Sequence, residues 1–116
     1  LLYARSRVAH AAASEGLDAI DVPYLDLEDS DGMRREAELV RDLGFSGKGS
    51  IHPKQIAILN DVFTPDAATI AYAQRILRAF EEADTGLVVV DGKLIEKPVL
   101  REMRRILSIA GRINQI

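Results

Sequence analysis

Hydrophobic residues recur at helical spacing in four long segments of the chain. The segments are about residues 1–15, 31–43, 65–83 and 98–110, and each sets an apolar stripe against a charged face. The residues predicted to form the stripes are Leu1, Ala4, Val8, Ala11 and Ala12, then Met33, Ala37, Val40 and Leu43, then Ile70, Ala73, Ile76, Leu77 and Phe80, and finally Leu100, Met103, Ile106, Leu107 and Ala110. A shorter helix is expected over residues 54–61.

Two short apolar stretches between these helices predict β-strands. The first, within residues 17–27, is expected to be a buried strand that ends near Pro23, because an interior proline would lose a hydrogen bond of the sheet. The second covers residues 47–51 and contains two glycines, which indicate a close approach of another backbone segment.

Polar residues and prolines mark the expected starts of the helices. Asp29 or Ser30 can accept hydrogen bonds from the first N–H groups of the helix over 31–43. Pro53 stands at the first position of the short helix, where its missing N–H costs nothing. Thr64 is the expected cap of the next helix, with Pro65 at its first position.

The last part of the chain departs from this alternation of strands and helices. Residues 87–96 are two apolar runs around Asp91-Gly92, a strong signal for a β-hairpin, and the final helix follows. We therefore expect two parts, residues 1–83 with two βα units and residues 84–116 as a hairpin-helix extension.

The predicted order of elements places the protein in the α/β class. Two parallel strands cannot cover both faces of a sheet, because such sheets need several strands and helices on both sides. The chain also begins without methionine and already in helical rhythm. We expect the rest of the sheet to lie upstream, in a longer chain of which this is the C-terminal part.

Composition excludes several classes of function. The 116 residues are 47% hydrophobic and 28% charged, and the net charge of −3 gives no general attraction to nucleic acid or to anionic membranes. The absence of cysteine excludes disulfides and thiolate metal sites. No apolar run approaches the roughly 18 residues of a membrane span, and no signal-peptide pattern is present, so we expect a cytoplasmic protein.

His52, between Ile51 and Pro53, is the first candidate for a functional site. The carboxyl ends of strands carry the chemistry in α/β barrels, and a helix start at that place suits an anion such as phosphate. On this interpretation His52 and the backbone N–H groups that follow it face a ligand. On the alternative interpretation His52 caps a helix that Pro53 begins.

Two carboxylates also stand in apolar surroundings. Asp21 could bind a ligand, or it could hold a loop by accepting N–H hydrogen bonds, since a buried carboxylate needs partners. Glu96 ends the second strand of the hairpin and could act as a general acid or base, or be an exposed charge. The acidic residues between 26 and 31 are interpreted as a solvated helix entry rather than a metal site.

Four segments together resemble one enzyme family. The segments are 18-DAIDVPYLDLEDSDGM-33, 44-GFSGKGSIHPKQI-56, 62-VFTP-65 and 87-LVVVDGKLIEKP-98. They resemble the C-terminal part of citrate lyase beta-subunit-like proteins of the HpcH/HpaI aldolase superfamily, which include citryl-CoA, malyl-CoA and citramalyl-CoA lyases. The resemblance implies that the two strands are the seventh and eighth of a (β/α)8 TIM barrel with a C-terminal extension. It also implies a homotrimer or a multiple of trimers.

The resemblance implies a lyase reaction on a CoA thioester. A carbon–carbon bond of a 3-hydroxyacyl-CoA would be cleaved or formed through an acetyl-CoA enolate, with Mg²⁺ polarising the substrate. The family's metal carboxylates lie on earlier strands, so no metal ligand is assigned within this chain. Ile51, His52 and Pro53 would lie beside the CoA portion of the substrate, and Asp21 is a further candidate for substrate binding.

Glu96 stands where the family carries an aspartate that acts as acid or base in a neighbouring subunit's site. The change keeps a carboxylate but lengthens the side chain by one methylene. Two other functions fit the same residues, a malyl-CoA thioesterase and a non-catalytic CoA-binding paralogue.

Overall fold

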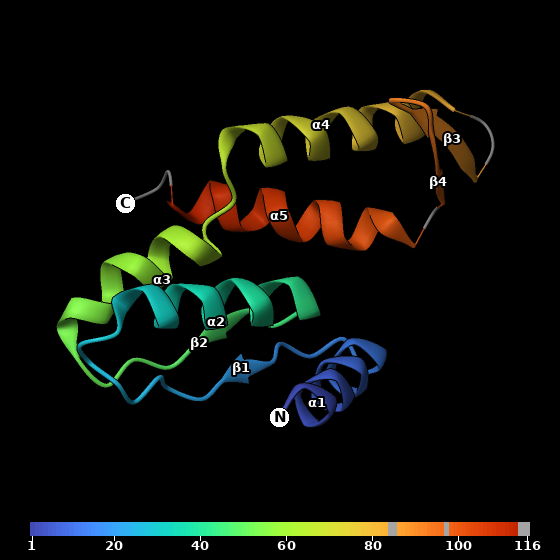
Figure 1. The fold of residues 1–116 in the computed structure, drawn as a ribbon. Helices are drawn as coiled ribbons and strands as arrows, with labels where there is room; N and C mark the ends of the chain where they lie inside the picture. Colours follow the sequence, from blue (N-terminus) through green and yellow to red (C-terminus); the bar gives the residue numbers. More distant parts are fainter. Residues whose placement is uncertain (84–85, 97, 114–116) are drawn as a thin grey trace. The chain divides into compact units, whose positions relative to one another are not determined.

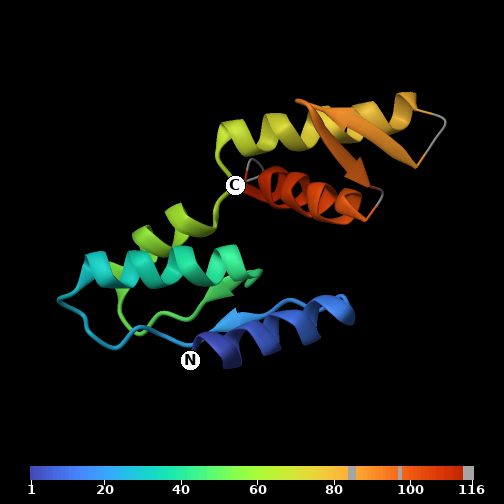
Figure 2. The same cartoon turned by 45° about the vertical axis from the view of Figure 1, so that its right-hand side comes forward.

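The computed structural model describes residues 1–83, 86–96 and 98–113 and divides the chain into two compact units, Leu1–Phe63 and Thr64–Ile116. Figures 1 and 2 show the two units as ribbons. The sequence suggested a division after residue 83, whereas the helix before that point groups with the hairpin and the last helix. No helix within these ranges is both long and apolar enough to cross a membrane.

The first unit alternates helices with two parallel strands. Its elements are α1 (Leu2–Ser14), β1 (Ile20–Asp21), α2 (Ser30–Leu43), β2 (Gly47–Lys48), the 3₁₀ helix η1 (Pro53–Gln55) and α3 (Ile56–Phe63). The strands pair in parallel, with Ile20 opposite Gly47 and Asp21 opposite Lys48. This order confirms the predicted α/β class and the predicted succession of elements, although both strands are shorter than expected.

Helix α2 contributes to both buried clusters of the first unit. Its residues Met33, Ala37 and Val40 are buried, as the predicted stripe requires. The helix begins as expected at Asp29, whose Oδ1 accepts a hydrogen bond from the Gly32 N–H at 2.9 Å. Helix α3 packs Leu59 and Val62 against the same residues.

Helix α1 packs only part of the apolar stripe that its spacing predicted. Leu1 and Val8 are exposed, Ala12 of the stripe packs against the core, and Ala9 is the buried residue of the helix. The inward face also carries Arg5, whose guanidinium bonds to Asp21 of β1. The face of α1 that packs on β1 therefore carries an ion pair between Arg5 and Asp21 in addition to apolar contacts.

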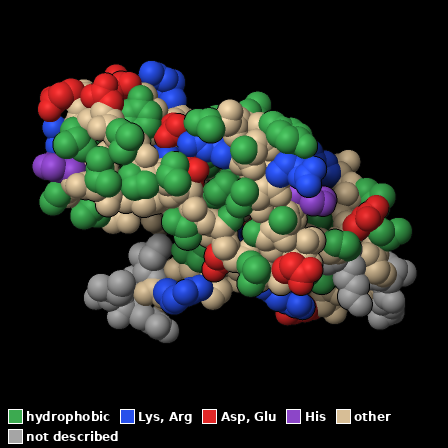
Figure 3. All heavy atoms as spheres, turned by 90° about the horizontal axis from the view of Figure 1, so that it is seen from below, with side chains coloured by type: hydrophobic (Ala, Val, Ile, Leu, Met, Phe, Trp, Pro, Cys, Tyr) green, Lys and Arg blue, Asp and Glu red, His purple; other side chains and the backbone are tan. Residues whose placement is uncertain are grey.

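The burial of β1 is also the reverse of the prediction. Asp21 is buried, whereas Ile20 and Val22 are 64% and 65% exposed. Successive side chains of a strand point to opposite faces, and α1 and α2 cover only the face that carries Asp21. Hydrophobic side chains consequently reach the surface, as the space-filling view in Figure 3 shows.

A cluster of four charged side chains joins the two strands to α1 and α2. The Lys48 side chain is fully buried, and its Nζ donates to Asp21 Oδ2 at 2.6 Å, to Glu36 Oε2 at 2.7 Å and to the Val22 carbonyl oxygen at 2.8 Å. Arg5 contacts Asp21 Oδ1 through Nε at 3.1 Å and Glu36 Oε1 through a terminal nitrogen at 3.0 Å. Every donor of the Lys48 ammonium has an acceptor.

Both carboxylates of this ion cluster are held in their charged form. Burial by itself would raise the pKa of Asp21, but the hydrogen bonds from Lys48 and then Arg5 outweigh it and lower that pKa. The pKa of Glu36 is lowered against the same opposing effect of burial, by the same two partners. The cluster is therefore two cations and two anions at neutral pH.

The second unit consists of a hairpin between two helices. Its elements are α4 (Ala67–Glu82), β3 (Leu87–Val90), β4 (Lys93–Glu96) and α5 (Val99–Ile113). The strands are antiparallel, and Asp91 and Gly92 between them both have positive φ, 52° and 76°. Positive φ at both central residues is the requirement of a type I′ turn, so the predicted hairpin is confirmed.

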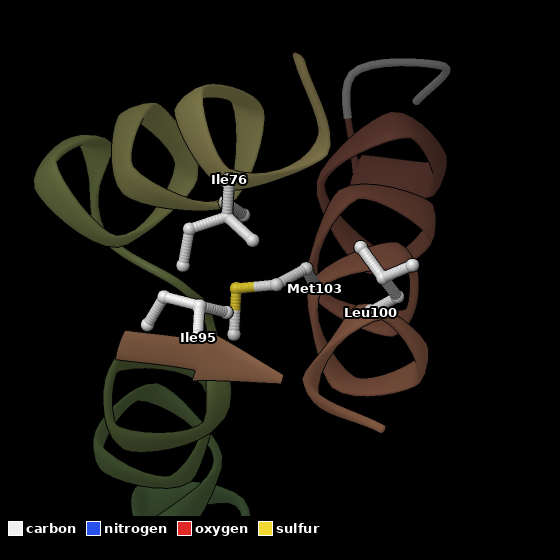
Figure 4. Packing of buried hydrophobic residues seen from close by; sticks show 5 residues of the cluster. Ile76, Ile95, Leu100 and Met103 are labelled. Atoms are coloured by element: carbon white, nitrogen blue, oxygen red, sulfur yellow. The ribbon is translucent and has the colours of Figure 1, made fainter. Parts of the chain in front are cut away.

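The core of this unit lies between the two helices and one face of the hairpin. Figure 4 shows Ile76 of α4, Ile95 of β4 and Met103 of α5 pointing toward one another, with Leu100 beside them. These residues are buried, together with Ala73. The stripes predicted for α4 and α5 are thus the ones that pack.

The start of α4 differs from the prediction. Asp66, not Thr64, caps the helix, and its Oδ1 accepts from the Thr69 N–H at 2.7 Å. Pro65 therefore precedes the cap instead of opening the helix. A carboxylate is favoured there because its charge also complements the helix dipole.

We expect Lys48→Met to destabilise the protein strongly. The substitution keeps the length of the side chain but leaves Asp21 and Glu36 without the ammonium, and breaking a buried pair costs about 3–5 kcal/mol. Lys54→Met is the matched control, because Lys54 pairs with the exposed Glu28 at 3.4 Å and exposed pairs add little stability. Urea unfolding of both variants provides the measurement, and equal midpoints for the two would contradict a structural role of Lys48.

Candidate active site

The loop after β2 lies directly against the loop after β1. The Gly49 N–H donates to the Asp21 carbonyl oxygen at 2.9 Å. A Cβ at Gly49 would lie 3.1 Å from Cγ of Pro23, closer than most side chains approach. The close approach that the glycines predicted is therefore present, and the carboxyl ends of the two strands adjoin each other.

His52 caps the helix that begins at Pro53. Its Nδ1 accepts a hydrogen bond from the Lys54 N–H at 3.1 Å, and its carbonyl oxygen accepts from the Gln55 N–H at 3.0 Å. A neutral imidazole that accepts through Nδ1 carries its proton on Nε2. The capping interpretation is thus realised in the structure.

The backbone N–H groups at this helix start are already bonded within the loop. The expectation that they face an anion is wrong for Lys54 and Gln55, because both N–H groups donate to His52. The side chains of Ile51, His52 and Pro53 are exposed. What the loop offers a ligand is therefore an aliphatic side chain, an imidazole and a proline ring.

Gln55 is a buried residue of this loop that the sequence analysis did not single out. Its Oε1 accepts from the Ile51 N–H at 3.0 Å and from the Ser50 hydroxyl at 3.3 Å, and its Nε2 donates to the Tyr24 carbonyl oxygen at 2.9 Å. The sequence offered one signal for this role: Gln55 is a polar residue at a position of the short helix that faces the core.

Asp21 lies in the ion cluster, where Lys48 and Arg5 bond its two carboxylate oxygens. The alternative role was to hold a loop by accepting N–H hydrogen bonds, whereas the partners of Asp21 are the side chains of Lys48 on β2 and Arg5 on α1. Binding of substrate by Asp21 stays a prediction. Lys48 was not among the residues singled out from the sequence, although a lysine and an aspartate on neighbouring strands indicate a pair.

The acidic residues before α2 serve the helix entry. Asp26 Oδ1 accepts from the Glu28 N–H at 3.0 Å, and Asp29 accepts from the Tyr24 hydroxyl at 2.7 Å and from Gly32. The hydrogen bond from Tyr24, followed by that from Gly32, lowers the pKa of Asp29. Across residues 1–83, 86–96 and 98–113, no three His, Asp or Glu side chains form a group that could hold a metal ion.

Glu96 lies on the outward face of the hairpin. The register places it opposite Leu87 and places Val89 opposite Leu94, and residues opposite each other share one face of the sheet. All four side chains are exposed, whereas Val88 and Ile95 on the other face pack into the core. The carboxylate thus stands among three exposed aliphatic side chains.

The amino-terminal half of the chain matches a known protein family. Residues 1–53 match the model of the HpcH/HpaI aldolase/citrate lyase family. The chain is 37% identical to the citrate lyase subunit beta of Leuconostoc mesenteroides subsp. cremoris, over 96% of this chain and 38% of that protein. It is 44% identical to a (3S)-malyl-CoA thioesterase of Cereibacter sphaeroides, over 89% of this chain and 37% of that protein.

A solved structure extends the likeness to the fold. The CitE protein of Mycobacterium tuberculosis, in complex with magnesium, acetoacetate and coenzyme A, superposes with a TM-score of 0.78 at 31% identity, over 94% of this chain and 40% of that one. The chain spans less than two fifths of the length of the two curated relatives. The family match, the identities across both units and the shared fold lead to one conclusion: the chain belongs to the HpcH/HpaI aldolase/citrate lyase family.

Proposed function

We propose that this chain forms part of a carbon–carbon lyase that cleaves, or in reverse forms, a 3-hydroxyacyl-CoA thioester such as citramalyl-CoA, malyl-CoA or citryl-CoA. The observation that carries the proposal is the likeness, over 94% of the chain, to CitE in complex with magnesium, acetoacetate and coenzyme A. The products of such a cleavage are an oxo acid and acetyl-CoA.

We further propose that β1 and β2 are the last two strands of a (β/α)8 barrel. Their parallel pairing, each followed by a helix, supports this assignment. The exposed Ile20 and Val22 support it as well, because an apolar strand face of this kind needs cover from other elements. On this assignment the loop of Ile51, His52 and Pro53 lies at the carboxyl ends of the strands, where barrel enzymes bind substrate.

Ile51, His52 and Pro53 would contact the CoA portion of the substrate. Their side chains are exposed while the backbone beneath them is bonded to Gln55 and to the cap of η1. A loop that is already ordered binds with a smaller loss of conformational entropy than a mobile one. The Nε2 hydrogen of His52 can donate to an acceptor on the ligand.

Glu96 would transfer the proton that completes the reaction. When the bond breaks, the hydroxyl proton of the substrate passes to water or to a base elsewhere in the protein, and the protonated Glu96 side chain gives its proton to the enolate carbon of acetyl-CoA, which becomes a methyl group. When the bond forms, the carboxylate removes a proton from that methyl group. The apolar outward face around Glu96 supports a location in the site of a neighbouring subunit, within a homotrimer or a multiple of trimers, since exposed apolar patches often mark such contacts.

Mg²⁺ would supply charge stabilisation for the substrate carbonyl. The residues described in this chain do not offer a set of ligands for it. Its carboxylate ligands are therefore proposed to lie elsewhere in the protein, and no residue of this chain is assigned to the metal.

Hydrolysis of malyl-CoA is the second candidate function. The 44% identity to a (3S)-malyl-CoA thioesterase favours it. A thioesterase breaks the carbon–sulfur bond with water and releases free CoA and the free acid, whereas a lyase releases acetyl-CoA on cleavage and consumes it in the reverse direction. The two reactions are separated by their products.

The intact protein should convert at least one of malyl-CoA, citramalyl-CoA and citryl-CoA to acetyl-CoA and an oxo acid, in the presence of Mg²⁺ and not in its absence. Chromatography of the CoA products and a coupled assay of the oxo acid give the measurement. Release of free CoA as the first product would favour the thioesterase. Turnover of none of the three esters would favour a non-catalytic CoA-binding paralogue.

Replacing His52 by asparagine should weaken the binding of the CoA ester by roughly tenfold, the scale of one lost contact. Asparagine is a good N-cap, so the change removes the imidazole while keeping the start of η1, and the melting temperature should stay nearly constant. The matched control is His10→Asn, since His10 is exposed on α1. Loss of several degrees in melting temperature with normal binding would leave His52 a structural cap only.

Glu96→Gln should lower kcat by about 10²–10⁴ with little change in KM, because it removes a proton carrier that acts in the transition state. Glu102→Gln is the control, since Glu102 is an exposed glutamate of the same unit that pairs with Arg105. Near-normal turnover by Glu96→Gln would end the proposed role.

A mixed assembly tests whether Glu96 acts in the neighbouring subunit. Subunits with Glu96→Gln are combined with subunits whose substrate loop is blocked by Ile51→Glu. If the carboxylate acts across the interface, some sites then join an intact loop to an intact Glu96, and partial activity returns. No recovery in verified mixed oligomers would place Glu96 in the site of its own subunit.

A further inference from the structure

Gln55 links the loop after β1 to the loop after β2. Its side-chain amide accepts two hydrogen bonds from Ser50 and Ile51 and donates one to the carbonyl oxygen of Tyr24, a residue 31 positions earlier in the chain. The residue is only 3% exposed. A buried amide that bonds on opposite sides fixes the Ile51 N–H and the Tyr24 carbonyl oxygen, because losing either bond removes a hydrogen-bond partner from a backbone group of one loop. The Ser50 hydroxyl is shared, since it also donates to the His52 carbonyl oxygen at 2.9 Å.

The side of the link that carries Tyr24 is itself anchored. The Tyr24 hydroxyl donates to Asp29, and Asp29 caps α2 through Gly32. A Cβ at Gly32 would meet both Asp29 Oδ2 and the Tyr24 hydroxyl, so glycine is required where these groups converge. Gln55 is therefore connected, through Tyr24 and Asp29, to the start of α2, a helix with a buried face.

The two loops also have a fixed closest approach. Gly49 lies against the ring of Pro23, and a side chain at Gly49 would push the loops apart. Contact at Gly49 limits how close the loops come, and the Gln55 hydrogen bonds limit how far they separate. Ile51, whose N–H is bound to Gln55, is held between these two limits.

We propose that Gln55 is a positioning residue for the substrate loop: it holds the backbone of Ile51 and His52 at a set distance from Tyr24, so that their exposed side chains are ordered before a CoA thioester binds. The proposal rests on the proposed function, because it assigns the loop to CoA. Gln55 itself is buried beneath the loop and acts through Ile51 and Ser50, not by contact with the ligand.

A positioning role of this kind has a kinetic signature. The CoA portion of a thioester is bound in the same way before and during the reaction, so contacts to it contribute uniform binding. Loss of uniform binding raises KM and leaves kcat nearly unchanged. A general loss of folded protein has the opposite signature, since it lowers the apparent kcat and leaves the KM of the remaining enzyme unchanged.

The test compares Gln55→Met and Gln55→Glu with the wild-type intact protein and with Leu59→Ala. Methionine fills the same space but makes none of the three hydrogen bonds, and glutamate at pH 7.5 keeps the two acceptor roles and loses the donor. Leu59 lies in the core of the same unit, on α3, and makes none of the three hydrogen bonds of Gln55, so Leu59→Ala lowers stability while the groups that form those bonds are all kept. Two probes are used. The first is free CoA, whose Kd is measured by calorimetry, and the second is whichever of the three CoA thioesters the wild-type protein converts, whose KM and kcat are measured separately.

Gln55→Met should weaken CoA binding and raise KM by roughly five- to tenfold, at a kcat within about twofold of wild type. Gln55→Glu should weaken binding too, and Leu59→Ala should leave both Kd and KM unchanged. If wild-type protein binds CoA and both Gln55 variants bind it equally well, the positioning role is overturned while the proposed function stands. If Gln55→Met does not fold, Gln55→Glu decides alone by the same criterion. If wild-type protein binds no CoA, the proposed function fails and the role of Gln55 in it fails as well.

Discussion

The Lys48 ammonium is the group on which the first unit depends. It is the one fully buried charge of β2, and it bonds at once to a carboxylate of β1, a carboxylate of α2 and the carbonyl oxygen of Val22. Two strands of two residues have few backbone hydrogen bonds to hold them together. The ion cluster adds side-chain bonds between the same strands and, through Arg5, brings α1 onto them. Buried ion pairs contribute less to stability than their short distances imply, because both charges lose their hydration. Here the pairs determine which faces of α1 and α2 pack against the two strands.

The elements that local chemistry determines could be predicted from the sequence. The stripes of α2, α4 and α5, the cap at Asp29 and the turn at Asp91-Gly92 all depend on residues within a few positions of one another. The inward face of α1 and the burial of Asp21 could not be predicted in this way, since they depend on partners 16 and 27 residues apart in the chain. Apolar periodicity is a weak guide where a charged residue faces inward.

The same distinction applies to the candidate site. The sequence located the loop of Ile51, His52 and Pro53, and it identified the capping role of His52 as one of two possibilities. It did not reveal that the N–H groups of Lys54 and Gln55 both donate to His52. Capping and ligand binding are predicted by the same residues at a helix start, so only the hydrogen-bond geometry distinguishes them. The bond from Gln55 to Tyr24 spans two loops that only the parallel pairing of the strands brings together.

The type I′ turn of the hairpin controls a side chain at the far end of β4. Antiparallel pairing alternates the two faces residue by residue, so a register slip of one position would exchange every inward and outward side chain. Glu96 would then point toward α4 and α5, and Ile95 would take its place outside. The two-residue turn with positive φ at both positions matches the present pairing. The direction of this carboxylate therefore depends on Asp91 and Gly92, at the opposite end of the strand, as well as on the packing of Ile95 beside it.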